Sequence, residues 1–187
     1  MLLVSGFGSA YDPADEGAAQ VHGEMGFRFS YAGLDEHGRP MQYDGRDTYQ
    51  PLPDLVRLLE SQVEHVHRST GRRVAIVAES EGTLIAKVYL MSRIDAPVDD
   101  LVMASPIVQP GRVYFPGGDE DGWGVAAGWQ LQGIGALLDQ LSTLDLTPDN
   151  PLVRSILELA PELRQALLCP VGGTSQLVLY PLADAVA

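Results

Sequence analysis

The chain has 187 residues, 45% of them hydrophobic, and a formal net charge of −13 at pH 7. This length and composition predict one sizeable core in a single globular domain that spans residues 1–187. An acidic chain with a pI near 4.5 and no cluster of Lys and Arg repels polyanions, which argues against nucleic-acid binding.

The first half of the chain predicts two short strands and one helix. The start, MLLVSGFGSA, begins inside a strand, Leu2 to Ser5, and lacks the basic region and the long apolar core of a signal peptide. Phe27 to Tyr31 predicts a second strand, followed by a long loop of a kind that is usually functional or mobile. Apolar residues then recur at spacings of three and four from Asp54 to Ser69, which predicts an amphipathic helix that Gly71 closes.

The second half continues the alternation of strand and helix. Strands are predicted at 74–78, 101–104 and 177–180, and helices between Ser80 and about Met91, at 129–141 and at 151–160. Asn150 is the expected N-cap of the last helix, with Pro151 as its first residue. The only cysteine, Cys169, excludes an internal disulfide and a Cys-based structural zinc site, and we expect it to pack as a small hydrophobe.

Alternating strands and helices predict an α/β fold, with an open, mainly parallel sheet and helices on both faces. No apolar run approaches the roughly 18 residues that cross a bilayer. This predicts a chain without a transmembrane segment. The sequence leaves the compartment open, with a soluble, cytoplasmic chain as the default. Because the chain begins inside one predicted strand and stops soon after another, both ends look like cuts through a larger fold.

One strand passes directly into a helix at a serine, in the sequence VAIVAESEGTLIAKVYL at 74–90. A residue on such a corner is cramped, so its neighbours two positions away have to be small, and Ala78 and Gly82 are small. The corner would hold the Ser80 side chain at the positive end of the helix dipole and beyond the carboxyl ends of the strands, where ligands bind in this fold class. The alternative is that Ser80 only caps the helix.

The segment A-E-S-E-G at 78–82 resembles the nucleophile elbow G-x-S-x-G of the α/β-hydrolase superfamily, with alanine at the first small position. VSGFGS at 4–9 and LVLYPLAD at 177–184 carry the resemblance over nearly the whole chain. It implies a three-layer α/β-hydrolase-like fold and a lipase- or esterase-like serine hydrolase that forms an acyl-enzyme on Ser80 and needs neither metal nor organic cofactor. The implied partner is a small-molecule ester substrate with a lipid-like or other acyl group.

By the same resemblance, the backbone N–H groups of Phe7 and Glu81 would form the oxyanion hole. An ordinary tight turn is the alternative interpretation of Gly6 and Gly8. Glu79 matches the glutamate of G-E-S-x-G elbows, whereas a glutamate after the serine is less usual. Two flanking carboxylates would disfavour an oxyanion but would favour an incoming imidazolium, and the sequence leaves this balance open.

Asp184 is the expected acid of the catalytic triad, because it follows the last strand and matches the family's D-x-V pattern as Asp184-Ala185-Val186. Asp119 and Asp121 are second choices, since some lipases place the acid one strand earlier. The plain alternative is a solvated aspartate near a chain end.

The triad histidine of the family follows the acid, yet all four histidines of this chain precede Ser80: His22, His37, His65 and His67. His65 and His67 are expected to be solvated on a helix away from the serine, whereas the loops that carry the other two could approach it. The simplest expectation is truncation, with the histidine beyond residue 187 and this chain inactive. Without a general base, a serine hydroxyl is a weak nucleophile.

Residues 117–165 lie where the family commonly inserts a lid or cap, and the two tryptophans of this segment could line an acyl pocket or simply pack in a core. A non-catalytic α/β-hydrolase-like domain that binds a small molecule or a partner is the alternative function. The missing histidine, Ala78 and the flanking glutamates favour it. Peptidase or thioesterase chemistry would use the same residues as an esterase.

Overall fold

The computed structural model describes residues 1–15, 26–107, 149–167 and 169–179. Within these residues, five strands form one all-parallel sheet in the order β2-β1-β3-β4-β5. The strands are β1 (Leu2–Val4), β2 (Phe27–Arg28), β3 (Val74–Glu79), β4 (Val98–Ala104) and β5 (Ser175–Leu179). The described helices are α1 (Leu52–Thr70), α2 (Glu81–Ser92) and α4 (Pro151–Leu167), with the short 3-10 helices η1 (Pro13–Asp15) and η2 (Gly45–Tyr49).

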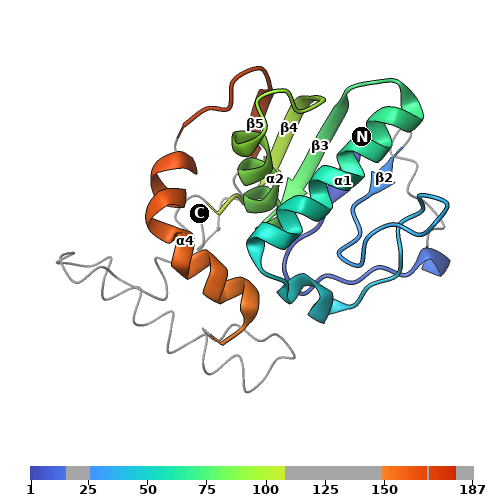
Figure 1. Ribbon diagram of the computed structural model, residues 1–187, viewed down its shortest axis with the longest axis horizontal. Coiled ribbons are helices and arrows are strands. Elements are labelled where there is room, and N and C mark those ends of the chain that lie inside the picture. Colours follow the sequence, from blue (N-terminus) through green and yellow to red (C-terminus); the bar gives the residue numbers. More distant parts are fainter. Residues whose placement is uncertain (16–25, 108–148, 168, 180–187) are drawn as a thin grey trace.

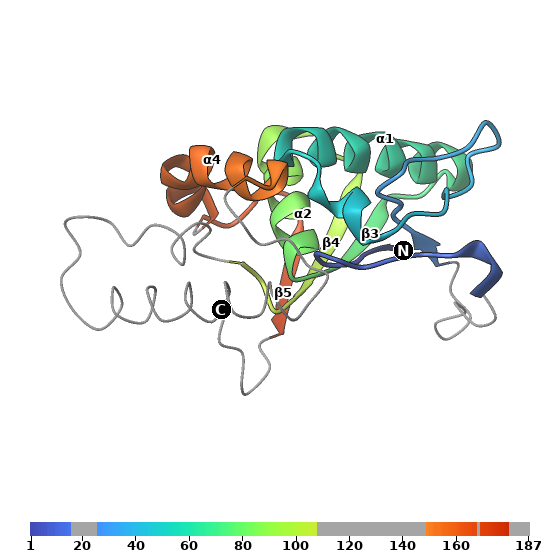
Figure 2. The ribbon, with the colours of Figure 1, turned by 90° about the horizontal axis from the view of Figure 1, so that it is seen from below.

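The three described α-helices lie on one face of the sheet, as seen in Figure 1 and edge-on in Figure 2. From β2 onward every connection moves the chain in the same direction across the sheet, first over β1 to β3 and then to β4 and β5. Right-handed crossovers in one direction place their helices on the same side of a sheet. The predicted α/β fold with a mainly parallel sheet is confirmed, and the helix predicted at 129–141 lies outside the described residues.

The core lies between the sheet and these helices. On β3, Val74, Ile76 and Ala78 are buried, whereas the alternate residues are half-buried or exposed, so the strand is fully buried on one face only. α1 contributes an apolar stripe at the predicted spacing, and it ends at Gly71, whose φ of 67° lies in the left-handed region. The N–H of this glycine donates to His67 O, so the predicted helix stop is confirmed.

β2 is shorter than predicted, because a side chain of α1 takes over the backbone hydrogen bonds that follow it. Gln62 is buried, accepts from Ser30 N (2.9 Å) and donates to Ser30 O (2.8 Å). The strand predicted for Phe27 to Tyr31 therefore covers only Phe27–Arg28. The aromatic side chains that follow it are still fully buried in the core.

The boundaries of the last two strands also differ from the prediction. β4 begins three residues earlier than expected, at Val98, because Asp99 and Asp100 extend the strand with exposed side chains. β5 covers Ser175–Leu179, and Tyr180, which was expected to end it, lies outside the described residues.

The start of α4 is confirmed and its predicted end is wrong. Asn150 Oδ1 accepts from Leu152 N at 2.9 Å, so Asn150 caps the helix as expected. The helix does not stop at residue 160 but continues through Pro161 to its end at Leu167. A proline removes one backbone hydrogen bond from a helix interior, and burial of Leu163 and Leu167 offsets that cost.

Candidate active site

Ser80 stands between β3 and α2 in a backbone conformation that residues other than glycine rarely adopt. Its φ of 49° and ψ of −119° turn the chain from strand to helix at a single residue. A conformation of this kind costs of order 1–3 kcal/mol, so the surrounding structure has to hold it. The Ser80 side chain makes no capping hydrogen bond to α2, and the alternative that it is an ordinary helix cap is wrong.

Hydrogen bonds to its backbone hold this corner. Ser80 N donates to Ala104 O at 3.0 Å, which extends the sheet ladder beyond the end of β3. Ser80 O accepts from the backbone N (3.0 Å) and from Oγ1 (2.6 Å) of Thr83. Thr83 Oγ1 in turn accepts from Ile107 N at 3.3 Å. Thr83, which the sequence pattern does not single out, therefore ties the corner to the segment that follows β4.

Close contacts with β1 explain the small residues around the serine. A Cβ at Gly82 would lie 2.7 Å from Val4 O, so α2 reaches β1 only because this residue is glycine. A Cβ at Gly6 would lie 3.0 Å from Ser80 Cβ and 3.5 Å from Ser80 Oγ. Ala78 is buried and pairs with Val4 in the sheet. The structure thus brings the predicted small residues and the loop after β1 against the serine.

The loop after β1 is a tight turn, closed by Ser9 N donating to Gly6 O at 3.2 Å. Gly8 occupies its third position with a φ of 72°, as such turns require. Phe7 occupies the second position, and its N–H donates to no acceptor in the described part of the chain. The tight turn that was the alternative for this loop is therefore present, and it leaves one backbone donor next to the serine corner.

η2 supports this turn and is not among the predicted elements. Gly8 N donates to Thr48 Oγ1 at 3.0 Å, and the ring of Phe7 stacks on Tyr49 with 4.9 Å between centroids. The sequence does hold a signal for η2, because D-G-R-D at 44–47 has the spacing of a capping box and both aspartates accept backbone hydrogen bonds there.

The carboxyl group of Glu81, the residue after the serine, lies in the protein interior. Glu81 is only 2% exposed, and neither carboxyl oxygen has a hydrogen-bond partner among the described residues. Burial raises the pKa of Glu81 well above its ordinary value, which favours the neutral form. The nearby Tyr31 hydroxyl already donates to Ser5 O at 2.6 Å. Since Glu79 is exposed, only one of the two flanking carboxyl groups faces solvent.

The described histidines lie away from Ser80. His67 lies near the end of α1, with Nδ1 2.7 Å from Arg72 O, close to the start of β3. β3 has six residues and so separates this end from Ser80 by about 20 Å. His65, on the same helix, packs against Gly38, where a Cβ would overlap its ring. His65 and His67 are therefore remote from the serine, as expected, but half-buried rather than solvated.

His37 lies in an exposed loop beside these residues. Its Nε2 is 3.4 Å from a carboxyl oxygen of Glu36, and the next residue, Gly38, contacts His65 of α1. The expectation that the loop of His37 could approach the serine is therefore wrong.

The remaining site predictions fall outside the described residues: Asp119, Asp121, Asp184 and His22, together with residues 117–148 of the predicted lid. The assignment of Asp184 as the triad acid stays a prediction. Within the described residues, no group of three or more His, Cys, Asp or Glu side chains could hold a metal ion. None of the helices described here combines the length and the apolar character that a membrane span requires.

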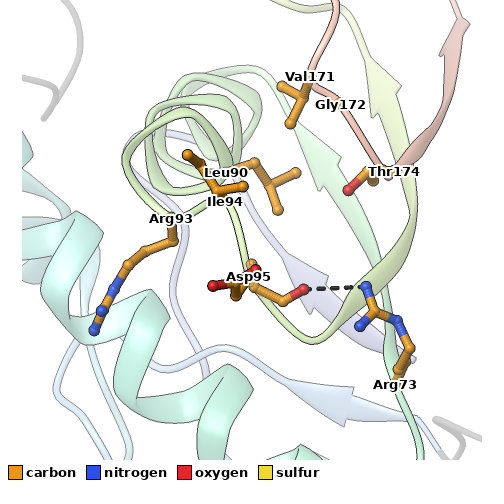
Figure 3. Close-up of a pocket in the computed structure, with 10 residues that line it drawn as sticks. Arg73, Leu90, Arg93, Ile94, Asp95, Val171, Gly172 and Thr174 are labelled. Atoms are coloured by element: carbon orange, nitrogen blue, oxygen red, sulfur yellow. Dashed lines mark hydrogen bonds between the residues drawn. The ribbon is translucent and has the colours of Figure 1, made fainter.

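A cavity of about 170 Å³ lies at the amino-terminal ends of β3, β4 and β5 (Figure 3). Ser80 follows the opposite end of β3. Arg73 lines it, but its Nη2 is committed to the backbone, donating to Ala96 O (3.1 Å) and Val98 O (2.9 Å). Arg93 points away from the cavity towards α1 (Figure 3), where it pairs with Glu60. The polar groups of this cavity therefore tie β3, β4 and the helices together.

A larger cavity, of about 350 Å³, lies on the helix side of β4 and β5 next to Thr83. Lys87 of α2 and Cys169 both line it. Cys169 is exposed, so the prediction that it packs as a small hydrophobe is wrong. The predictions from the sequence do not include Lys87. It could have been noticed, because it is the single charged residue in the helical stretch TLIAKVYL and the only lysine of the chain.

No family model matches the chain, and no curated protein matches its sequence. Its structure is nevertheless similar to that of phospholipase PlaB from Legionella pneumophila, with TM-scores of 0.57 and, for the complex with thio-NAD, 0.56. The chain shares its fold with a phospholipase. The alignments cover 96% of this chain at 13% identity, but only 36% and 38% of the PlaB chains, so the chain spans less than two fifths of that protein's length. At this identity the likeness to PlaB establishes the α/β fold.

Proposed function

We propose that this chain carries the nucleophile of an α/β-hydrolase-type serine hydrolase that cleaves carboxylic esters with lipid-like acyl groups. The observation that carries the proposal is the serine corner, in which Ser80 has a φ of 49° between a strand and a helix, with Gly6 against its Oγ. Glycine would adopt this conformation more easily, so a serine there needs a reason beyond folding. The structural likeness to PlaB supports a lipase-like hydrolase at a coarse level.

In the proposed reaction, Ser80 Oγ attacks the ester carbonyl carbon while a histidine takes the hydroxyl proton. The carbonyl oxygen becomes an oxyanion, to which the N–H groups of Phe7 and Glu81 donate. Neither N–H has an acceptor among the described residues, and the first N–H groups of a helix have no partner within it. Loss of one such donor typically costs about 10²–10³ in rate.

The second half of the reaction returns the serine to its starting state. The tetrahedral intermediate expels the alcohol, which takes the proton from the histidine and leaves the acyl group on Ser80. Water then attacks the acyl-enzyme, the histidine again takes and returns a proton, and the carboxylic acid leaves. No metal or organic cofactor takes part in these steps.

The buried Glu81 carboxyl is compatible with this reaction in its neutral form. A negative charge beside the oxyanion would oppose its formation, whereas a protonated carboxyl group would not. Burial, by raising the pKa of Glu81, favours the protonated form. Glu79 is exposed and stays available to an approaching imidazolium.

The general base is the part of the mechanism that the described residues do not supply. None of the three histidines they contain lies near Ser80. We therefore propose that the base is either His22 or a histidine in a longer product of the gene, with Asp184 as the acid of the triad. The competing function is a non-catalytic domain that binds a small molecule. The position of the described histidines away from Ser80 favours it.

Fluorophosphonate labelling followed by mass spectrometry tests the proposal, on this chain and on the complete product of its gene. We expect the label on Ser80, lost in Ser80→Ala and retained in Ser105→Ala. Ser105 is a matched control because it too has a positive φ, 50°, at the end of the neighbouring strand. Added imidazole should accelerate labelling if only the base is missing. Absence of label from Ser80 in both folded proteins, with and without imidazole, would reject the hydrolase and leave the binding domain.

A further inference from the structure

Lys87, the only lysine of the chain, is 6% exposed in the middle of α2. Its Nζ donates a hydrogen bond to a neutral acceptor, Gln176 Oε1, at 2.8 Å. No described carboxylate forms an ion pair with it. Burial lowers the pKa of Lys87, and the nearby Cys169 thiol opposes this to a smaller extent. A buried ammonium group without a compensating carboxylate is costly, because its charge has lost the stabilisation that water provides.

The cavity of about 350 Å³ that Lys87 lines is otherwise mostly apolar. Its walls come from β4, α4, β5 and the segment after β4, through Met103, Leu167, Val178 and Ile107. No Asp or Glu is among its described lining residues, although the chain has 25 of them. Small-molecule sites typically enclose about 300–1,000 Å³ and combine apolar walls with a few polar groups that fix orientation.

We propose that this cavity binds a small amphiphilic carboxylate, such as a medium-chain fatty acid, with its head group on Lys87 and its chain against the apolar walls. An ammonium group has three N–H donors, of which Gln176 takes one, and the described residues supply no acceptor for the other two, which a carboxylate could use. A second hydrogen bond, from Gln176 Nε2 to Val171 O at 3.4 Å, orients the amide group so that its oxygen faces Lys87. The proposal does not rest on the hydrolase function, since none of these residues takes part in the proposed reaction.

A carboxylate fits better than a larger or more highly charged anion. A single ammonium group compensates one negative charge, and no second cation is among the described residues of this cavity. A buried charge without a counter-charge is costly, and apolar walls gain free energy from contact with an apolar chain. One bound carboxylate with an apolar chain supplies both the counter-charge and the apolar contact.

Isothermal titration of the folded chain with sodium octanoate, and with 1-octanol as the neutral ligand of equal chain length, tests the site. Octanoate should bind about 10- to 100-fold more tightly than 1-octanol, as expected for hydrogen bonds to a charged group. Lys87→Met should weaken octanoate binding by the same factor and leave 1-octanol binding unchanged. Arg93→Met, which removes one positive charge outside this cavity, should bind octanoate like the parent chain. Equal binding of the two ligands to the parent chain, or no octanoate binding, would overturn the proposal.

A second measurement remains valid if Lys87→Met does not fold. Cys169 lines the same cavity and is the only cysteine, so octanoate should slow its alkylation by iodoacetamide, whereas 1-octanol at the same concentration should not. Unchanged alkylation at saturating octanoate would place the ligand elsewhere and refute the site. Ser80→Ala should retain full octanoate binding. Loss of binding in that variant would assign the ligand to the serine corner instead, and it would do so whether or not Ser80 reacts with fluorophosphonates.

Discussion

Replacement of Ser80 by glycine is expected to stabilise the protein while it removes the proposed nucleophile. A residue with a Cβ at a φ of 49° and ψ of −119° carries a strain of about 1–3 kcal/mol that glycine does not. Glycine in turn loses more conformational entropy on folding, which costs about 0.5–1 kcal/mol. Ser80→Gly should therefore be more stable than Ser80→Ala by about 1 kcal/mol, or about 2–4 °C in Tm for a chain of 187 residues.

Urea unfolding followed by circular dichroism measures this difference. Ser80→Ala is the reference, because it also lacks the hydroxyl group but keeps the Cβ. Ser61, exposed within α1, gives a control with ordinary helical backbone, where glycine should be less stable than alanine by about 1 kcal/mol. If glycine is the less stable residue at position 80 as well, the corner is not strained, and the argument that Ser80 is retained for function loses its basis.

Two further predictions concern the neighbours of Ser80. Gly82→Ala should lower the unfolding free energy by about 1–3 kcal/mol, because its Cβ would lie 2.7 Å from Val4 O. Gly172→Ala, with nothing within 4 Å, should be nearly neutral, and equal thermal shifts of the two variants would contradict the close approach of α2 to β1. In the unfolded protein the Glu81 carboxyl group ionises above about pH 4.5, whereas its pKa is raised in the folded protein. The folded state therefore binds more protons than the unfolded state, and the wild type loses stability as the pH rises. Glu81→Gln lacks this loss, so its stability relative to the wild type should increase as the pH rises above about 4.5 in urea titrations, and a constant difference would disprove the raised pKa.

The serine corner could be predicted from the sequence because its signals are local. The apolar run of β3 gives way to helical spacing at Ser80, and the need for small residues at 78 and 82 follows from chain geometry alone. The parallel sheet could be predicted for the same reason, since the order of strands and helices restricts the topology. The stop of α1 at Gly71 depends only on the conformation of one residue.

Other features depend on contacts between residues far apart in the chain, which no local pattern shows. β2 ends early because Gln62, 32 positions later, takes the hydrogen bonds of Ser30. The burial of Glu81 follows from the packing of α2 against β1 and Tyr31. α4 runs through Pro161 because tertiary burial of its last turns outweighs the local cost of proline.

The ladder of the sheet also links the serine to a strand that it never touches. Ser80 N donates to Ala104 O, and the next residue, Ser105, donates from its own N to Leu179 O of β5, each at 3.0 Å. Ser80 is thus two rungs from the outermost strand of the described sheet, whose apolar side chains at 177–179 are exposed. A change in the position of β5 would therefore reach the backbone of Ser80 through only two hydrogen bonds.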